Sequence, residues 1–453
     1  MMTERPRLLI IGGDAAGMSA ASQARRMNPE LEIVAFERGP HTSYSACGIP
    51  YYVGDLIAEP SMLIARDPAA FRANGIDARI LHDVEEIDVN NHALTVRSLE
   101  SGQTSQERYD ELVVATGARP VRPPFPGIDA SNVFALSTLQ DGILAKAFVD
   151  SNKLEQAVII GGGYIGLEMA EACIMRGLHT TLIEQNSEVM ATLDPDMGHL
   201  ASEAVRTLGV ELLLGERVEA IETAGDVAVA VTTNRRSIQA DIVVLGIGVR
   251  PNTSLAAAAG IPLGETGAIW VDERQRTRVE HVWAAGDCAE SMHRVSRRPI
   301  HIALGTVSNK QGRICGINLG GGYARFPGVV GTATTKVGDT EIARTGLNES
   351  EARAAGFDFS SASTSSKTRT GYFPGAEKIT VKIVVERETE RLLGAQIVGG
   401  PSSAKRIDTL AAAITAGMTA TEFEYLDLSY APPVAPVWEP AQIAARRAAQ
   451  AGR

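Results

Sequence analysis

The stretch AVIIGGGYIG, residues 157–166, decides the fold that we expect for this chain. Its apolar run is typical of a strand buried on both faces, and its glycines suit the turn into a helix that begins near Leu167. Such glycines let the backbone approach a dinucleotide pyrophosphate, whose charge the helix N-terminus stabilises. The next expected strand, 180–183, ends at Glu184, roughly 20 positions after the first glycine, where a carboxylate can bind a ribose diol. The stretch therefore predicts a dinucleotide-binding fold.

A second, less regular copy of this pattern opens the chain. The apolar run 8–11 enters GGDAAG at 12–17, and a helix is expected over 18–26. Asp14 stands where the middle glycine is usual, so an ordinary strand-to-helix turn is the alternative interpretation. The following strand, 32–36, ends at Glu37, again near the spacing of a ribose-binding acid. Two nucleotide sites in one chain suggest that one nucleotide delivers electrons to the other.

Length and composition restrict the classes of protein to consider. The 453 residues favour two to four domains, and 44% hydrophobic with 21% charged residues describe a soluble globular protein. The net charge of −11 argues against nucleic acid as a partner, so an anionic ligand has to be held by local basic groups. No apolar run has the length of a membrane span or a secretory signal. The four cysteines form no CxxC pair and the histidines show no metal-ligand spacing, so we expect a cytoplasmic chain with reduced thiols and no metal site.

Three further segments extend the pattern along the chain. They are YDELVVATG at 109–117, ADIVVLG at 240–246 and TRVEHVWAAGD at 277–287. In this order, the five segments resemble the two-dinucleotide-domain flavoproteins of the pyridine nucleotide–disulfide oxidoreductase family. The resemblance implies an α/β fold in which a Rossmann-like FAD domain is interrupted by a Rossmann-like NAD domain, followed by a C-terminal α+β dimerisation domain. The expected boundaries are 1–119 and 248–325 for the FAD domain, 120–247 for the NAD(P)H domain and 326–453 for the dimerisation domain.

The same resemblance implies which residues hold the cofactors FAD and NADH. Asp287 would hydrogen-bond the ribityl chain of the flavin, Glu37 would bind the adenosine ribose, and Tyr164 would cover the flavin until NADH enters. The cofactor-binding positions are expected at Gly12, Ala15, Ala16, Gly17, Glu37, Arg38, Ser43, Ala115, Thr116, Gly117, Gly161, Gly163, Tyr164, Ile165, Gly166, Glu168, Glu184, Gly248, Gly286 and Asp287. Glu184 would repel a 2′-phosphate and its neighbours Gln185 and Asn186 add no cation, so NADH is preferred and NADPH stays possible.

One cysteine stands in TSYSACGIPYY, residues 42–52, with no second cysteine nearby. Position 52 is Tyr, so Cys47 has no partner for an internal disulfide at this site. The stretch resembles the SFxxCGxP motif of the single-cysteine subgroup, which contains coenzyme A disulfide reductases, NADH oxidases, NADH peroxidases and persulfide reductases. In that subgroup the cysteine alternates between a thiolate and a mixed disulfide, sulfenic acid or persulfide. A helix N-terminus at Cys47 would lower its pKa and supply the thiolate, whereas the alternative interpretation is a buried structural cysteine.

Neighbouring positions help to separate these chemistries. Peroxidases and water-forming oxidases of the subgroup carry a histidine where this chain has Ala15, which disfavours peroxide chemistry. By resemblance, a coenzyme A molecule would contact Gln23, Arg26 and Ser43, and more loosely Asn309 and Arg313. Arg26 alone could equally be a solvated arginine on a helix face. Ala46 replaces the asparagine usual before the cysteine of the reductases, which puts tight coenzyme A binding in question.

Two tyrosines in the last third match positions that reach the active-site sulfur from the partner subunit in coenzyme A disulfide reductases. They are Tyr372, in GYFPG, and Tyr430, in DLSYAPP. Their hydroxyls could protonate a leaving thiolate or hydrogen-bond a polysulfide. The alternative is that both pack in a homodimer interface, where tyrosine is common.

The sequence thus predicts an FAD-dependent NAD(P)H oxidoreductase that reduces coenzyme A disulfide, or a related small disulfide, through Cys47. NADH would pass a hydride to FAD, and reduced FAD would break the Cys47 mixed disulfide. An NADH oxidase or a per- or polysulfide reductase on the same scaffold is the first alternative. Persulfide-reducing members often carry a rhodanese domain after the dimerisation domain, so in this chain sulfur is expected from a separate source. An electron-transfer flavoprotein that reduces a partner or an acceptor dye is the alternative from another class.

Overall fold

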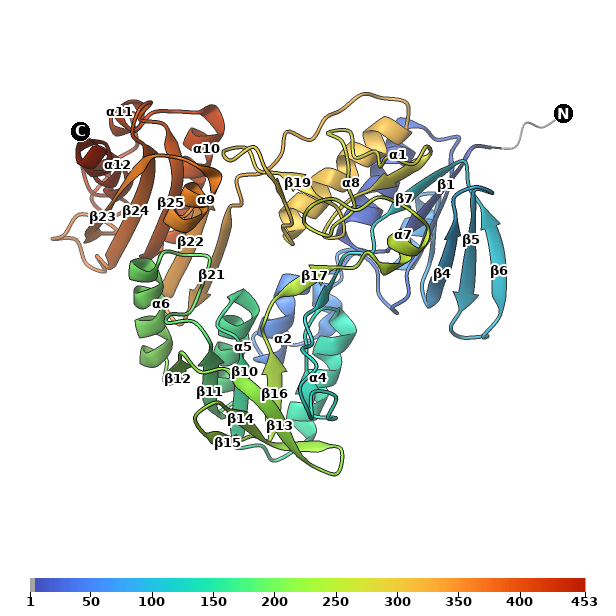
Figure 1. The fold of residues 1–453 in the computed structure, drawn as a ribbon, viewed down its shortest axis with the longest axis horizontal. Coiled ribbons are helices and arrows are strands. Elements are labelled where there is room, and N and C mark those ends of the chain that lie inside the picture. The colour runs from blue at the N-terminus through green and yellow to red at the C-terminus, as the bar shows by residue number, and fades with distance from the viewer. Residues whose placement is uncertain (1–4, 453) are drawn as a thin grey trace.

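The structure is a computed structural model that describes residues 5–452 and has three lobes (Figure 1). The first lobe contains a five-stranded parallel sheet in the order β18–β7–β1–β2–β3. Its strands are β1 (Arg7–Ile11), β2 (Glu32–Phe36), β3 (Ile76–Arg79), β7 (Glu111–Val114) and β18 (Val282–Ala284). Because β18 pairs with β7 across more than 160 residues of chain, the polypeptide leaves this lobe and returns to it.

Two helices pack together on this sheet without bulky side chains between them. They are α1 (Ala15–Met27) and α8 (Gly305–Leu319), which lie side by side in Figure 1. A Cβ at Gly312 would lie 2.1 Å from the Ala16 carbonyl oxygen, and one at Gly316 would lie 2.5 Å from that of Ala20. This close approach requires glycine, and it brings α8 against the N-terminal half of α1. Other elements of the lobe are β4 (His82–Asp88), β5 (Ala93–Ser98), β6 (Thr104–Arg108), α3 (Pro68–Ala73), α7 (Ser254–Ala258), β19 (Ser291–Met292) and β20 (Pro299–Ile300). The helix α2 (Ile49–Val53) belongs to this part of the sequence but packs against the second lobe.

The second lobe repeats the parallel architecture in the order β12–β11–β10–β16–β9. Its strands are β9 (Val133–Phe134), β10 (Gln156–Ile160), β11 (His179–Glu184), β12 (Glu211–Leu214) and β16 (Ile242–Leu245). Its helices are α4 (Leu139–Ser151), α5 (Tyr164–Met175) and α6 (Pro195–Thr207), and an antiparallel sheet of β13 (Val218–Ala224), β14 (Val227–Thr233) and β15 (Ser237–Gln239) lies at its far end. The predicted second dinucleotide fold is confirmed.

A two-stranded antiparallel ribbon marks where the chain crosses between these lobes. It pairs β8 (Ala118–Pro120) with β17 (Val249–Pro251). The predicted boundaries near 119 and 247 fall within or beside the two strands of this ribbon. The ribbon supports the boundaries near 119 and 247, and all the predicted domain boundaries remain a proposal.

The third lobe is the expected α+β unit at the C-terminal end. Its antiparallel sheet has the order β21–β22–β25–β24–β23. The strands are β21 (Ala333–Val337), β22 (Thr340–Gly346), β23 (Phe359–Lys367), β24 (Lys378–Glu386) and β25 (Leu392–Gly399), and the helices are α9 (Glu349–Ala355), α10 (Ile407–Ala416), α11 (Ala420–Glu424) and α12 (Pro440–Gly452). The two central strands β24 and β25 are buried almost throughout, because helices cover the sheet.

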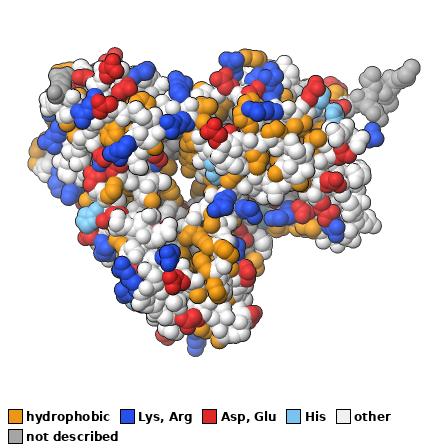
Figure 2. Space-filling view, in the orientation of Figure 1, with side chains coloured by type: hydrophobic (Ala, Val, Ile, Leu, Met, Phe, Trp, Pro, Cys, Tyr) orange, Lys and Arg blue, Asp and Glu red, His pale blue; other side chains and the backbone are white. Residues whose placement is uncertain are grey.

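Acidic and basic side chains are interspersed over the face shown in Figure 2, without one dominant patch of either sign. On this face an anionic ligand therefore depends on basic groups close to its own site. Among the helices of residues 5–452, none has both the length and the apolar character that crossing a membrane requires.

Candidate active site

The turn between β1 and α1 forms a tight backbone cradle. Gly12 has a φ of +110°, and a Cβ there would lie 2.1 Å from the Ala115 carbonyl oxygen. A Cβ at Gly17 would lie 2.0 Å from the Gly12 carbonyl oxygen, so α1 crosses directly over the turn. Ala15 and Ala16 form the first turn of α1, whose N-terminus therefore lies at this cradle. The arrangement fits the pyrophosphate of FAD, because a side chain on either glycine would disrupt the turn.

The turn between β10 and α5 has the same construction. Gly161 has a φ of +102°, and a Cβ there would lie 2.6 Å from the Gly246 carbonyl oxygen. A Cβ at Gly166 would lie 1.9 Å from the Gly161 carbonyl oxygen. Gly163 caps α5, which opens with Tyr164 and Ile165. This second cradle fits the pyrophosphate of a nicotinamide dinucleotide.

The two predicted ribose-binding acids make matching contacts. Glu37 accepts a hydrogen bond from the Gly13 backbone N–H at 2.7 Å and another from the Gly39 N–H at 2.6 Å. Glu184 accepts from the Gly162 N–H at 2.7 Å and from both the backbone N–H and the side-chain amide of Asn186, at 2.8 and 2.7 Å. In each lobe the carboxylate is therefore fixed at the rim of its own glycine turn. Arg38, beside the first acid, is exposed.

Residues expected around the flavin follow the neighbouring strands β7 and β18 at the same edge of the first sheet. Ala115, Thr116 and Gly117 follow β7, and the Thr116 hydroxyl donates to the Asn252 carbonyl oxygen at 2.6 Å. Gly286 and Asp287 follow β18. The Asp287 carboxylate accepts a hydrogen bond from the Ser308 hydroxyl at 2.6 Å, and burial raises its pKa. Gly248, with a φ of +94°, lies just before β17 at the crossing between the lobes.

Cys47 lies in a single 3-10 turn, Ala46–Gly48, that runs directly into α2. It is the only exposed cysteine of the chain; Cys173, Cys288 and Cys315 are buried. The alternative of a buried structural cysteine is therefore wrong. Partial desolvation raises the pKa of the Cys47 thiol, and the negative charges of Glu168, Asp287 and Asp14 raise it further.

The expectation that a helix N-terminus lowers the Cys47 pKa is thus wrong for the groups of this chain, although the helix start is where it was expected. The α2 helix has only five residues, so its dipole is weak. The three carboxylates come from α5, from the segment after β18 and from the first glycine turn. They show that parts of both dinucleotide lobes face the sulfur.

Asp14 has a role that the sequence pattern did not reveal. Its carboxylate accepts a hydrogen bond from the Tyr44 backbone N–H at 3.0 Å, and the Ser43 N–H donates to the Gly13 carbonyl oxygen at 2.9 Å. These two bonds fasten the cysteine segment to the first cradle. Burial, with the nearby charges of Glu37 and Asp287, raises the pKa of Asp14 to about 7. The departure from the glycine pattern was the only signal in the sequence.

Tyr164 and Glu168 lie on the face of α5 toward the third lobe. A hydrogen bond links Tyr164 to the Thr192 side chain, and burial raises the Tyr164 pKa. Glu168 accepts from the Thr335 hydroxyl in β21 at 2.9 Å, and burial raises its pKa. The pair therefore lies where the second and third lobes meet.

The candidate coenzyme A residues lie on the adjoining helices α1 and α8. The Arg26 guanidinium donates to the buried Gln23 side chain at 2.7 Å. Arg26, Asn309 and Arg313 are exposed, and the Asn309 side chain accepts from the Ser19 hydroxyl at 2.7 Å. Ser43, with a φ of +48°, stands at the start of the cysteine segment. Sequence reasoning missed Arg66, whose guanidinium lies 3.4 Å from the Ser22 hydroxyl on α1 and adds a third cation to this surface.

Tyr372 and Tyr430 lie on two loops of the third lobe that contact one another. The Thr370 N–H donates to the Pro432 carbonyl oxygen at 3.4 Å, which joins the loops. The tyrosines are 76% and 46% exposed. Such exposure leaves both side chains available to another subunit.

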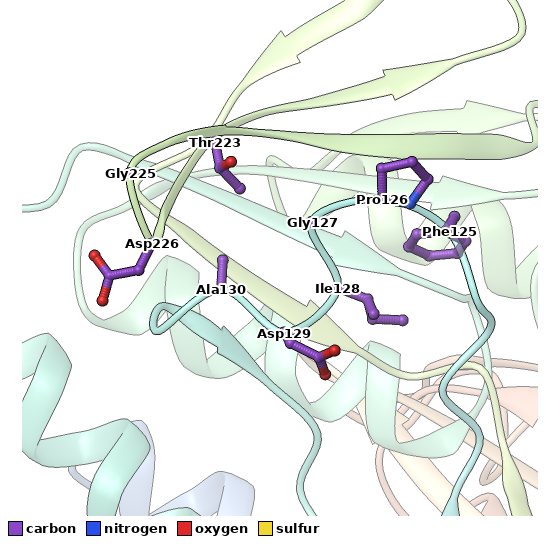
Figure 3. A pocket seen from close by; sticks show the side chains of 9 residues that line it. All are labelled: Phe125, Pro126, Gly127, Ile128, Asp129, Ala130, Thr223, Gly225 and Asp226. Carbon is purple, nitrogen blue, oxygen red and sulfur yellow. The ribbon is translucent and has the colours of Figure 1, made fainter.

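One hollow at the surface lies away from all of these residues. It has a volume of about 420 Å³ and lies between residues 125–130 and the hairpin of β13 and β14 (Figure 3). No predicted site residue lines it. Among residues 5–452, no group of three or more His, Cys, Asp or Glu side chains is arranged to hold a metal ion.

Comparisons with known proteins agree with this geometry. Residues 6–307 match the family described as pyridine nucleotide-disulphide oxidoreductase, and residues 332–441 match the dimerisation domain of that family. The chain is 41% identical to an NAD(P)H sulfur oxidoreductase (CoA-dependent) of Pyrococcus furiosus, over 98% of this chain and 99% of that protein. It is 34% identical to an NADH oxidase of Methanocaldococcus jannaschii, over 98% of both chains.

A solved structure, an NAD-dependent persulfide reductase from A. fulgidus, superimposes with a TM-score of 0.94 at 41% identity. The match covers 98% of this chain and 82% of that one. The fold, the two dinucleotide cradles and the family matches over most of the sequence lead to one conclusion. The chain belongs to the pyridine nucleotide-disulphide oxidoreductase family.

Proposed function

We propose that this enzyme uses NAD(P)H to reduce a small sulfur–sulfur bond, with coenzyme A disulfide or a related disulfide as the substrate class and Cys47 as the attacking sulfur. The observation that carries the proposal is the position of Cys47. It is exposed, it lacks a second cysteine with which to pair, and groups from both dinucleotide lobes face it. A structural thiol would need neither exposure nor this surrounding.

The chemistry is a balanced exchange at one sulfur. The Cys47 thiolate attacks one sulfur of R–S–S–R, forms Cys47–S–S–R and expels the first RS⁻, which takes up a proton. FAD, when bound, accepts the hydride of NADH and supplies the electron pair that cleaves the mixed disulfide. Cleavage restores the Cys47 thiolate and releases the second thiol. Each cycle uses one NADH, one disulfide and one proton and yields NAD⁺ and two thiols.

The surface formed by α1 and α8 supports a coenzyme A moiety as part of the substrate. Arg26, Arg66 and Arg313 provide guanidinium groups suited to phosphates, and Ser43 leads from this surface to Cys47. Ala46 beside the sulfur offers no side-chain hydrogen bond. The phosphates therefore provide most of the recognition, and the sulfur end is held weakly.

A per- or polysulfide is the second candidate substrate. It is favoured by the names of two relatives at 41% identity, a CoA-dependent sulfur oxidoreductase and a persulfide reductase. Oxygen is a weaker candidate, because Ala15 stands at the start of α1 where the oxygen-cleaving members have histidine.

A homodimer would complete the site. The third lobe matches the dimerisation domain of the family, and Tyr372 and Tyr430 present exposed hydroxyls on adjoining loops. We assign these tyrosines to the sulfur of the partner subunit, where a phenol can give its proton to the leaving thiolate.

NADH is the expected donor. Glu184 is buried, its carboxylate is fixed by two neighbouring backbone N–H groups, and no Lys or Arg pairs with it among the described residues. A 2′-phosphate at this position would meet an uncompensated negative charge.

Steady-state turnover, measured without oxygen except where oxygen is the acceptor, tests the proposal directly. Purified enzyme with FAD and NADH is offered coenzyme A disulfide, polysulfide or oxygen in parallel, and thiol or sulfide release is counted against NADH. We expect coenzyme A disulfide or polysulfide to give stoichiometric turnover that Cys47→Ser abolishes. Turnover of all acceptors at wild-type rates in Cys47→Ser, with an acceptor dye as the best substrate, would instead identify an electron-transfer flavoprotein.

A further inference from the structure

The helix that follows Cys47 packs into the second lobe, although its sequence belongs to the first. Ile49, Tyr52 and Val53 of α2 are buried in one apolar cluster with residues of α4 and α5. In Figure 1, α2 lies beside these two helices, away from the sheet of the first lobe. The helix that follows the sulfur is therefore held by the second lobe, whereas the residues before the sulfur are tied to the first lobe by the hydrogen bonds at Ser43 and Tyr44.

Two glycines let this packing become very close. A Cβ at Gly142 of α4 would lie 2.5 Å from the Ile49 Cγ2 atom, at the first residue of α2. A Cβ at Gly54, just after α2, would lie 3.2 Å from the Ala172 Cα atom of α5. Since both ends of α2 are in close contact with the second lobe, a small shift of either helix has to move α2 with it.

Charged side chains cluster just after the C-terminal end of α2. The Asp55 carboxylate forms ion pairs with Lys146 of α4 and Arg176 at the end of α5. Asp150 pairs with the same two cations, at 3.5 Å from the Lys146 ammonium. Lys146 and Arg176 have side chains only 11% and 17% exposed. Of the two carboxylates, only Asp55 belongs to the cysteine segment.

We propose that Asp55 is a positioning residue for Cys47: it ties α2 to α4 and α5 and thereby fixes the sulfur relative to both nucleotide lobes. Asp55 acts through α2 and does not touch the reacting sulfur. The inference rests on the proposed function for its consequence in catalysis, but the position of the thiol can be measured without turnover.

The test compares Asp55→Asn with the matched control Asp150→Asn. Both variants remove one carboxylate from the same two cations, yet only the first removes ion pairs of the cysteine segment. The readout is the rate of alkylation of Cys47 by iodoacetamide across a pH series, because the other three cysteines are buried. The rate of mixed-disulfide formation with coenzyme A disulfide is measured beside it.

We expect Asp55→Asn to slow mixed-disulfide formation about tenfold and to displace the pH profile of alkylation, since small displacements of a reacting group have large effects on rate. Asp150→Asn should stay within about twofold of wild type, because it leaves α2 attached. Asp55→Glu keeps the charge and should recover most of the rate. Equal effects of Asp55→Asn and Asp150→Asn, or an unchanged pH profile in Asp55→Asn, would overturn the proposal.

A second variant guards against misfolding. If Asp55→Asn lowers the midpoint of thermal unfolding below the assay temperature, Lys146→Gln removes the tie from the α4 side and leaves the cysteine segment unchanged. It should displace the alkylation profile in the same way, and an undisturbed profile would contradict the proposal. If the wild-type enzyme does not turn over disulfides but its Cys47 alkylation profile responds to the Asp55 variants as predicted, the result would count against the proposed function and not against the role of Asp55.

Discussion

The two dinucleotide lobes share one design and differ at one position of the turn. In each, a strand enters a glycine turn, and an acid from the next strand accepts a 2.7 Å hydrogen bond from the second residue of that turn. The third residue is Gly163 in one lobe and Asp14 in the other. Asp14 uses its carboxylate to hold the Tyr44 N–H of the cysteine segment. We propose that the shared parts bind a dinucleotide in each lobe, and the departure ties the first lobe to the segment that carries Cys47.

The lobes also differ in their cysteines. Cys47 is exposed beside the first cradle, whereas Cys173 is fully buried in α5 of the second lobe, and burial raises its pKa to about 12. A thiol in apolar packing is a poor nucleophile, so our proposal assigns the reactive sulfur to the first lobe.

The largest expected effect is the loss of that sulfur. Cys47→Ser should lower disulfide reduction at least about 1,000-fold, because the covalent step is lost, while FAD and NADH binding stay unchanged. Cys173→Ser is the control and should keep most activity. Steady-state rates and the flavin spectrum measure both variants, and comparable losses in the two would remove the distinction between the lobes.

The next largest effect separates the two cradles. Gly12→Ala places a Cβ against the Ala115 carbonyl oxygen at a positive φ and should weaken FAD binding about 100-fold. Gly161→Ala should weaken NADH binding to a similar degree and leave FAD bound. Fluorescence titration with FAD and with NADH measures the dissociation constant of each nucleotide. If Gly161→Ala released FAD as readily as Gly12→Ala, the assignment of one nucleotide to each lobe would be wrong.

A smaller effect concerns the choice of nucleotide. Glu184→Gln removes the charge that opposes a 2′-phosphate, while the amide oxygen can still accept one of the hydrogen bonds of the carboxylate. The ratio of kcat/KM for NADPH over NADH should therefore rise about tenfold. Glu37→Gln, at the matching position of the first lobe, should not change this ratio. A rise in Glu37→Gln alone would reverse the assignment of the lobes.

A separate effect concerns the stability of the protein and not its turnover or ligand binding. Because the folded protein holds the Asp14 proton up to about pH 7 instead of the ordinary 3.8, its contribution to the free energy of unfolding is fully present at low pH and is lost as the pH rises toward 7. The loss amounts to at most about 4 kcal/mol. Asp14→Asn should flatten this decline between pH 4 and 7. Urea unfolding of the apoprotein across that range provides the check, and a parallel slope in both proteins would exclude the role of Asp14.

Much of the architecture could be predicted, because it depends on local patterns. The apolar runs 8–11 and 157–160 become the buried strands β1 and β10, and the glycines at positions 12 and 161 adopt the positive φ values that such turns need. These features lie within a few residues of one another. The resemblance of the five segments to a family added the order of the domains, which short patterns cannot give.

What could not be predicted depends on groups distant in sequence. Burial raises the Cys47 pKa, and carboxylates that lie 33 residues before it and far after it raise it further. A rule about helix ends therefore predicted the wrong direction of the shift. In the same way, α2 follows the first lobe in sequence and packs against the second, since its apolar face meets α4 and α5. Tertiary contacts of this kind do not produce a regular spacing of residues from which they could be predicted.

The most direct test of the account is the mass of the Cys47 peptide after one equivalent of coenzyme A disulfide is added without NADH. The account predicts a single coenzyme A adduct on Cys47 that one equivalent of NADH removes when FAD is bound. An unmodified Cys47, or an adduct that NADH leaves in place, would contradict it.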